Sequence, residues 1–439
     1  MHISAHLDVD VLALETEDQL SVLIELTAPP APPTETKRPA STLEVVLDRS
    51  GSMHGGRLDG AKTALVNLID QLDPTDMFGL VTFDNRVQVV VPAAPLTDKA
   101  EVKRVVAAVE SGGSTDLSSG YLRGIQEARR AAGPAGATVL LISDGHANAG
   151  VTDPDTLAGI ATEAHGHNVT TSTLGYGLGY DERIMSALAR GGAGNEHFAE
   201  EPDTAIALIA GEVTGLLAQT AQAASLRIRP STHVRRVQVL NELPVTNTDN
   251  EVLAELGSFY ADEKRKVLLV FDVPGIPSLG LAEVASLVFT YVELPALKEH
   301  TVTVALHVNV VPGDDAAGRV PDPVVRTELV YLRAQQAKRR ASSFLSAGDA
   351  AAALLEIRAA QDAVTQALEA APPQLVADLA EEVEALRYLV DQTERGMISR
   401  AAKYSTMDVS YKSRTRGRTV PPSAVPPSAV PPSSAGEPS

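Results

Sequence analysis

The sequence predicts a multidomain protein of the α/β plus β class. We expect a Rossmann-like, mostly parallel sheet with helices on both faces, inserted in or attached to an antiparallel β-sandwich, and a helical bundle at the carboxyl-terminal end. Three observations predict this. Short apolar runs alternate with amphipathic segments from residue 42 to about 217, helical periodicity is absent from 224–311, and helical spacing returns over 324–394.

The amino-terminal arm, residues 1–28, alternates polar and apolar side chains, as at Val22, Ile24 and Leu26, which is typical of half-buried strands. We expect this arm to pair into the β-sandwich, so that the α/β domain is an insertion; packing on the α/β domain alone is the alternative. Residues 29–41 are rich in proline and predict a linker, because proline fits neither helix interiors nor central strands.

The α/β domain is expected over residues 42–219. Its apolar runs predict strands at 43–47, 77–83, 87–91, 138–143 and 169–174. Its amphipathic segments predict helices at 58–72, 98–110, 119–132, 154–165, 181–190 and 203–218. Ligands of such sheets bind at the carboxyl ends of the strands, so the turns that follow the strands are the place to look for a site.

The second half of the chain predicts three further regions: a β-sandwich over 220–315, a bundle of three helices over 324–395 and a disordered tail over 396–439. Asp349 and Gln374 stand near the starts of two of these helices. The tail contains, just before its PPSAV repeats, the basic segment 412–418, which we interpret as solvated, with docking on an acidic partner or on the protein itself as the alternative. It ends in PPSAV repeats that lack the apolar residues needed to fold.

Composition excludes several classes of function. The net charge of -19, from 56 acidic and 37 basic residues, argues against general nucleic-acid binding. The sequence has no cysteine, which excludes disulfides and thiolate metal sites. No apolar run approaches the ~20 residues of a membrane span, and the first residues lack the pattern of a secretion signal. We therefore expect a cytoplasmic protein without membrane partners, whose oligomeric state stays open.

Oxygen-bearing side chains gather in three segments: two follow predicted strands, and the third precedes a predicted helix. Asp48, Ser50 and Ser52 come directly after the buried strand LEVVL, Thr115 lies in the glycine-rich segment GGSTD, and Asp144 follows TVLLIS. A parallel sheet brings such turns together. One carboxylate and two hydroxyls in the first turn are hard ligands, which favour Mg²⁺ or Mn²⁺ over zinc or copper. The alternative is that these residues only cap a turn and a helix.

The segments DRSGSM, LDGAKTAL, FGLVTFDN, GGSTDLSSGY and VLLISDGHANAG, in this order between residues 42 and 217, resemble the von Willebrand factor type A domain of bacterial intracellular proteins. The resemblance implies a metal-ion-dependent adhesion site that binds Mg²⁺, with Mn²⁺ or Ca²⁺ as alternatives. Its ligands would be the five oxygen-bearing residues Asp48, Ser50, Ser52, Thr115 and Asp144.

Such a site implies divalent-cation-dependent binding of a partner protein, whose Asp or Glu carboxylate completes the coordination of the ion. Three further residues are candidates for contacts with that ligand. Arg49 selects an acidic partner or is an exposed charge. His146 contacts the ligand or is an ordinary loop residue, which we favour. Asp116 orients Thr115 or caps the following helix.

Two other functions stay open: a cytosolic scaffold or adaptor for an ATPase remodelling complex, and a metal-assisted hydrolase. We expect no enzyme, because the familiar catalytic motifs are incomplete. Ser50 stands where an aspartyl phosphatase needs its second carboxylate, and Asp48 where the G-x-S-x-G motif needs its first glycine. Ala61 stands where a phosphate-binding loop needs lysine.

Overall fold

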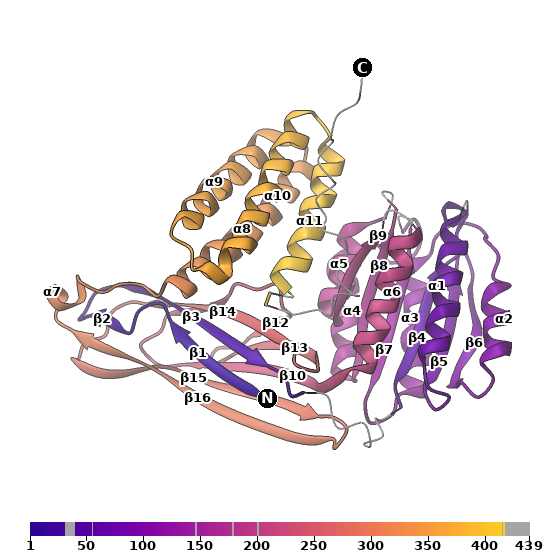
Figure 1. The fold of residues 1–439 in the computed structure, drawn as a ribbon, viewed down its shortest axis with the longest axis horizontal. Helices are drawn as coiled ribbons and strands as arrows, with labels where there is room; N and C mark the ends of the chain where they lie inside the picture. The colour runs from indigo at the N-terminus through magenta and orange to yellow at the C-terminus, as the bar shows by residue number, and fades with distance from the viewer. Residues whose placement is uncertain are drawn as a thin grey trace.

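The computed structural model describes residues 1–30, 40–54, 56–144, 147–177, 180–199, 202–414 and 416–417. Figure 1 shows an α/β domain, a β-sandwich beside it and a group of carboxyl-terminal helices that contacts both. This architecture confirms the predicted fold class. Within the described ranges, no helix has the length and apolar character needed to cross a membrane.

The α/β domain is built on a six-stranded sheet in the order β6-β5-β4-β7-β8-β9. Neighbouring strands are parallel, except that β6 is antiparallel to β5. The strands are β4 (Thr42–Asp48), β5 (Met77–Phe83), β6 (Val87–Pro95), β7 (Ala137–Ser143), β8 (Val169–Tyr176) and β9 (Ala193–Ala199). The apolar runs predicted all of them but β9, whose sequence AGNEHFA has few apolar residues because it forms a sheet edge.

Six helices cover the two faces of this sheet (Figure 1). They are α1 (Arg57–Gln71), α2 (Lys99–Ala107), α3 (Leu117–Ala131), α4 (Pro154–Gly166), α5 (Glu182–Gly191) and α6 (Pro202–Leu217). The helices α1, α2 and α6 bury apolar side chains against one face, and α3, α4 and α5 against the other. Aspartates accept backbone N–H groups at the amino ends of α2 to α5, which fixes where these helices begin.

The β-sandwich consists of two mainly antiparallel sheets, in the orders β1-β3-β14-β11 and β12-β13-β10-β15-β16-β2. The strands are β1 (His2–Leu7), β2 (Val11–Ala13), β3 (Asp18–Thr27), β10 (Gln219–Pro230), β11 (Arg236–Val239), β12 (Val245–Asn247), β13 (Val252–Tyr260), β14 (Lys264–Val273), β15 (Gly280–Glu293) and β16 (Lys298–Val311). Apolar side chains of both sheets, among them Phe259, Phe271 and Phe289, fill the space between them.

The amino-terminal arm belongs to the sandwich, as expected, because β3 pairs with β14 along its whole length. The α/β domain follows β3 and precedes β10 in the chain, so it is inserted within the β-sandwich. Its last helix, α6, ends at Leu217, and β10 begins at Gln219. One residue therefore separates α6 from a strand inside the six-stranded sheet of the sandwich.

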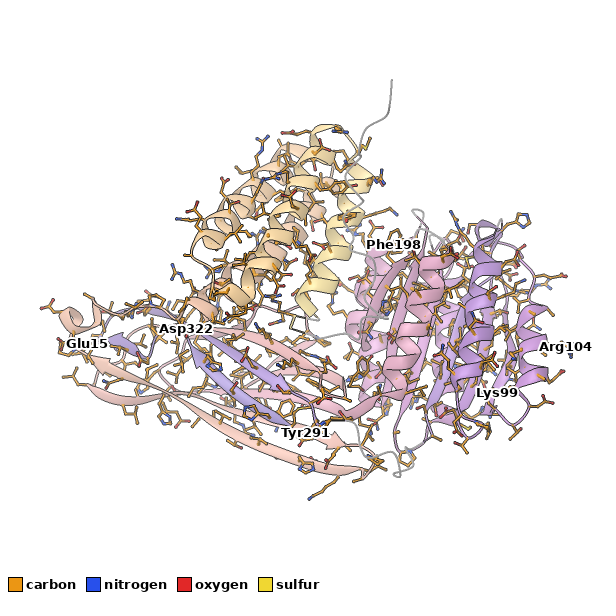
Figure 2. The ribbon with its side chains drawn as sticks, in the orientation of Figure 1. Glu15, Lys99, Arg104, Phe198, Tyr291 and Asp322 are labelled. Carbon is orange, nitrogen blue, oxygen red and sulfur yellow. The ribbon has the colours of Figure 1, made fainter. Side chains whose placement is uncertain are left out.

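The carboxyl-terminal helices extend further than predicted. After the short α7 (Gly313–Ala316) come α8 (Pro323–Ser346), α9 (Ala350–Glu369), α10 (Val376–Glu394) and α11 (Ile398–Arg414). The expectation of three helices that end at 395, followed by a disordered tail, is therefore wrong for α11. Figure 2 shows Phe198 of β9 on the side of the α/β domain that faces these helices, and Lys99 and Arg104 on the far side. Lys403 of α11 donates to the Tyr180 carbonyl at 2.8 Å.

The basic segment that starts at Lys412 is also placed differently from the expectation of a solvated tail. Lys412 Nζ lies 3.0 Å from Glu382 Oε2, and Arg416 Nε lies 2.7 Å from Glu328 Oε2. Both cations are buried, so the alternative of docking on the protein itself holds for them. The reason is tertiary: the buried carboxylates of α8 and α10 require cationic partners. The PPSAV repeats lie outside the described residues.

Candidate metal-binding site

The turn after β4 places a fully buried carboxylate at the centre of the domain. Asp48 ends β4, and its Oδ1 accepts the Ser50 backbone N–H at 2.8 Å. Its Oδ2 accepts the Ser143 hydroxyl at 2.6 Å, from the last residue of the neighbouring strand β7. Burial raises the pKa of Asp48, and these neutral hydrogen bonds only partly oppose that rise.

The hydroxyls of the same turn meet the second predicted aspartate. Ser50 Oγ and Ser52 Oγ lie 3.0 Å apart, and Ser52 Oγ donates to Asp144 Oδ1 at 2.8 Å. A short 3₁₀ helix, Gly51–Met53, brings the two serines to the same side of the turn. Ser52 is exposed while Ser50 and Asp144 are buried, so this group of oxygens opens to solvent on one side.

Thr115 lies in the adjoining loop, which precedes α3. The loop is held against the turn by backbone hydrogen bonds from Gly51 N–H to the Gly113 carbonyl at 3.0 Å and from Gly112 N–H to the Arg49 carbonyl at 2.6 Å. The Thr115 backbone N–H donates to Asn148 Oδ1 at 3.1 Å. The structure thus joins four of the five predicted ligands through side-chain or backbone hydrogen bonds and places the fifth in a neighbouring loop.

Two of the three candidates for ligand contacts have other partners in this structure. The Arg49 guanidinium pairs with Asp84 at 3.2 Å and is 22% exposed, so it is not a free surface charge. Asp116 caps α3, because its Oδ1 accepts the Ser119 N–H at 3.1 Å, as in the helix-cap alternative. His146 lies outside the described residues.

Sequence reasoning missed Arg57 at this site. Arg57 Nη1 donates to Asp144 Oδ2 at 2.6 Å and to the Ser52 carbonyl at 3.2 Å. It is the first residue of α1, after Gly56, whose φ of 102° suits only glycine without strain. The sequence could have indicated Arg57, because a cation directly after a glycine and at the start of an amphipathic helix lies next to the turn that follows β4.

The donor set suits a hard cation. It contains two carboxylates and three hydroxyls, and among the residues that the structure describes no three His, Cys, Asp or Glu side chains lie close enough to hold an ion. A metal here would therefore depend on hydroxyl and water ligands, which Mg²⁺ accepts because it retains much of its water. Both Asp48 oxygens accept hydrogen bonds only from neutral donors in the described part of the chain. A metal ion beside Asp48 would therefore not compete with a protein cation for this carboxylate.

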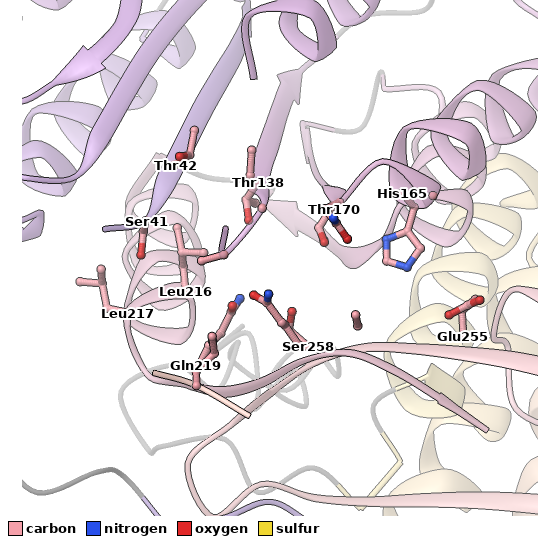
Figure 3. A pocket seen from close by; sticks show the side chains of 18 residues that line it. Ser41, Thr42, Thr138, His165, Thr170, Leu216, Leu217, Gln219, Glu255 and Ser258 are labelled. Atoms are coloured by element: carbon pink, nitrogen blue, oxygen red, sulfur yellow. The ribbon is translucent and has the colours of Figure 1, made fainter. Parts of the chain in front are cut away.

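A cavity between the α/β domain and the sandwich is not part of this site. The cavity has a volume of about 190 Å³, and Figure 3 shows Thr42, Thr138 and Gln219 around it. Thr42 begins β4, whereas Asp48 ends it. The cavity and the oxygen cluster therefore lie at opposite ends of the same strand.

Comparisons with known proteins agree with the predicted fold and with the place of the α/β domain in the chain. The family model described as the von Willebrand factor type A domain matches residues 43–210. An uncharacterized protein of Synechocystis is 30% identical over 162 residues, which are 37% of this chain and 38% of that protein. The human inter-alpha-trypsin inhibitor heavy chain H4 is 27% identical over 176 residues, or 37% of this chain and 19% of that one. The chain thus spans well under half the length of these curated relatives.

Two solved structures share nearly the whole architecture. VWA2, the ArnB paralog of Sulfolobus acidocaldarius, has a TM-score of 0.65 and 16% identity, and the match covers 97% of this chain and 99% of that one. A von Willebrand factor type A protein from Catenulispora acidiphila has a TM-score of 0.69 and 17% identity over 88% and 89% of the two chains. At such identities the likeness concerns the fold.

Proposed function

We propose that the von Willebrand factor type A domain formed by residues 43–210 of this chain binds a divalent cation. Through this ion, the domain would bind an acidic side chain of a partner protein. Asp48, Ser50, Ser52, Thr115 and Asp144 would hold the ion. Mg²⁺ fits the donor set best, with Mn²⁺ and Ca²⁺ as alternatives. A bound dication supplies an electrophilic coordination position that a carboxylate can fill.

The observation that carries this proposal is the contact between hydroxyls and a carboxylate from turns that are far apart in the sequence. Ser50 Oγ, Ser52 Oγ and Asp144 Oδ1 form a continuous chain of oxygens with spacings of 3.0 and 2.8 Å. A site that served only to cap helices would have a serine oxygen on their first backbone N–H groups. The cap position of α1 is instead Gly56, which has no side chain, and Ser50 precedes the 3₁₀ helix without a side-chain cap hydrogen bond.

The chain's own residues also explain why a partner's carboxylate would bind more strongly than water. Asp48 and Ser50 are buried at the base of the site, so water would screen the attraction between a bound dication and the partner's carboxylate only weakly. Ser143 holds Asp48 through its hydroxyl at 2.6 Å, which keeps the carboxylate oriented while the ligand side stays open at Ser52. Oriented outer groups of this kind tune the affinity of metal sites.

Calorimetric titration of the full chain with Mg²⁺ and Mn²⁺ tests the first half of the proposal. Ser50→Ala should lose most of the binding, because it removes one hydroxyl ligand with little change in volume. Thr156→Ala is a matched control: its hydroxyl donates to Asp153 Oδ2 at 2.6 Å at the start of α4, away from the site. Wild-type protein that binds neither ion at millimolar concentration would contradict the proposal.

Peptide binding tests the second half. A surface-bound peptide with one central glutamate should bind the wild-type chain in Mg²⁺ and lose binding in chelator, and its glutamine counterpart should bind in neither. Equal binding with and without cation would favour the scaffold alternative. Hydrolysis of an ester or phosphoester that Ser50→Ala abolishes would favour the hydrolase.

A further inference from the structure

Arg57 joins the helix α1 to the base of the candidate metal site. Its guanidinium Nη1 lies 2.6 Å from Asp144 Oδ2, and the Asp144 side chain is fully shielded from solvent while that of Arg57 is 38% exposed. A half-exposed cation therefore covers a buried carboxylate. The other oxygen of Asp144 accepts from Ser52 Oγ, so the ion pair and the metal-ligand candidates share one carboxylate.

The guanidinium is held from a second side. A Cβ built on Gly177, in the turn after β8, would lie 3.0 Å from Arg57 Cζ. Gly177 has a φ of 78° and donates its N–H to the Ala199 carbonyl, which fixes the turn. A side chain at Gly177 would contact the guanidinium, so Arg57 has a defined position between Asp144 and Gly177.

The charges at the site are unequal. Asp48 takes its hydrogen bonds from the Ser143 hydroxyl and the Ser50 amide, both neutral. Among the ion pairs of the described ranges, Arg57 alone contacts either of the two aspartates at the site; Arg49, the other nearby cation, pairs with Asp84. One protein cation therefore compensates one of two carboxylates, and it occupies the carboxylate that a metal ion would also use.

We propose that Arg57 is a positioning residue that keeps Asp144 paired while no metal is bound and that opposes the entry of a dication, so that it weakens the metal affinity of the site. This inference rests on the proposed function. Two positive charges on one carboxylate repel each other strongly where water is excluded. When a metal ion binds, either the Arg57–Asp144 ion pair breaks or the two cations remain close and repel each other. Each of these costs free energy and lowers the affinity of the site for the metal ion.

The proposal predicts effects of opposite sign in the two states, which a merely structural role does not. Without metal, Arg57→Gln leaves Asp144 buried and unpaired, so the melting temperature should fall by about 2–4 °C. With metal, the same substitution removes the competing charge, so the affinity for Mg²⁺ should rise about 10-fold. A structural role would lower both the melting temperature and the affinity.

The test combines calorimetric Mg²⁺ titration with thermal unfolding in chelator and in Mg²⁺, on the full chain. Arg57→Lys retains the charge and serves as the second variant, with an expected affinity between those of wild type and Arg57→Gln. Arg104→Gln is the matched control, because Arg104 is exposed and pairs only with Glu101 of the same helix, α2, among the ion pairs of the described residues. Its titration should match that of wild type.

The outcomes separate this inference from the proposed function. Tighter Mg²⁺ binding by Arg57→Gln, together with a lower melting temperature in chelator, supports it. Unchanged or weaker binding by both Arg57 variants, while wild type binds Mg²⁺, overturns the role of Arg57 and leaves the proposed function intact. Absence of binding in wild type and in all variants overturns both.

Discussion

Glu44 provides the sharpest test of the energetics of the α/β domain. It lies in the middle of β4, is completely buried, and neither of its carboxyl oxygens has a hydrogen-bond partner among the described residues. Gly79 of the adjacent strand makes room for it: a Cβ there would lie 1.9 Å from Glu44 Oε2. The nearest cations, Arg123 and Arg130, are already paired with Glu127.

The pKa of Glu44 determines the magnitude. Burial, and then the charge of Glu127, raise this pKa from 4.5 to about 9, so Glu44 is protonated in the folded protein at neutral pH. Because the folded pKa is the higher one, stability is lost as the pH rises from the unfolded to the folded value. Each pKa unit corresponds to about 1.4 kcal/mol, which predicts a loss of about 3 kcal/mol by pH 7 and about 6 kcal/mol by pH 9.

The perturbation is Glu44→Gln, which keeps the shape and removes the titration. Because glutamine does not titrate, the free energy that burying its side chain costs is the same at every pH. Urea unfolding followed by far-ultraviolet circular dichroism, from pH 5 to pH 9, should therefore show the variant gaining on wild type by about 1.4 kcal/mol per pH unit. Glu101→Gln is the control, because Glu101 is exposed and paired with Arg104, which lowers its pKa. That variant should show no such gain.

A constant difference between Glu44→Gln and wild type across this pH range would refute the reasoning. It would mean that Glu44 ionises near its ordinary pKa in the folded state, and hence that water or a cation reaches the middle of β4.

Three further substitutions test one contact between two domains and two buried ion pairs within single domains. Lys403→Met should free α11 from the Tyr180 carbonyl, seen as faster hydrogen exchange at the start of α5 without loss of the bundle itself. Burial opposes ionisation of Glu212, but the hydrogen bond and charge of His197, together with hydrogen bonds from Ser172 and Asn195, lower its pKa from 4.5 to about 2. Glu212→Gln should therefore remove about 3 kcal/mol of stability that wild type loses between about pH 5 and pH 2, measured by urea unfolding. Lys338→Met should leave two buried carboxylates of α10 and α11 without this cation and destabilise the bundle by about 3 kcal/mol, detected as early proteolysis of α11.

Local sequence patterns were sufficient for the elements with strong periodicity. The apolar run LEVVL predicted the buried strand β4, and the alternation through Val22 and Ile24 predicted β3. The alternation did not predict that Ser21 and Leu23, on the opposite face of β3, are buried as well, because α8 packs on that face. Local sequence patterns also indicated the candidate site: an Asp after a strand, hydroxyls on an open turn and a second strand end at Asp144 are contiguous sequence signals, and the topology of a parallel sheet brings them together.

The sequence by itself determined the class of the regions up to about residue 394 and the oxygen-rich turns, because periodicity, glycine and proline act locally. Only the tertiary structure decided which charges are paired. The sequence analysis did not single out Arg57, which the structure places beside Asp144, and it predicted a solvated Lys412, which lies 3.0 Å from Glu382. An ion pair between distant segments has no sequence period, since its partners are chosen by how the elements pack and by the high cost of a buried, uncompensated charge.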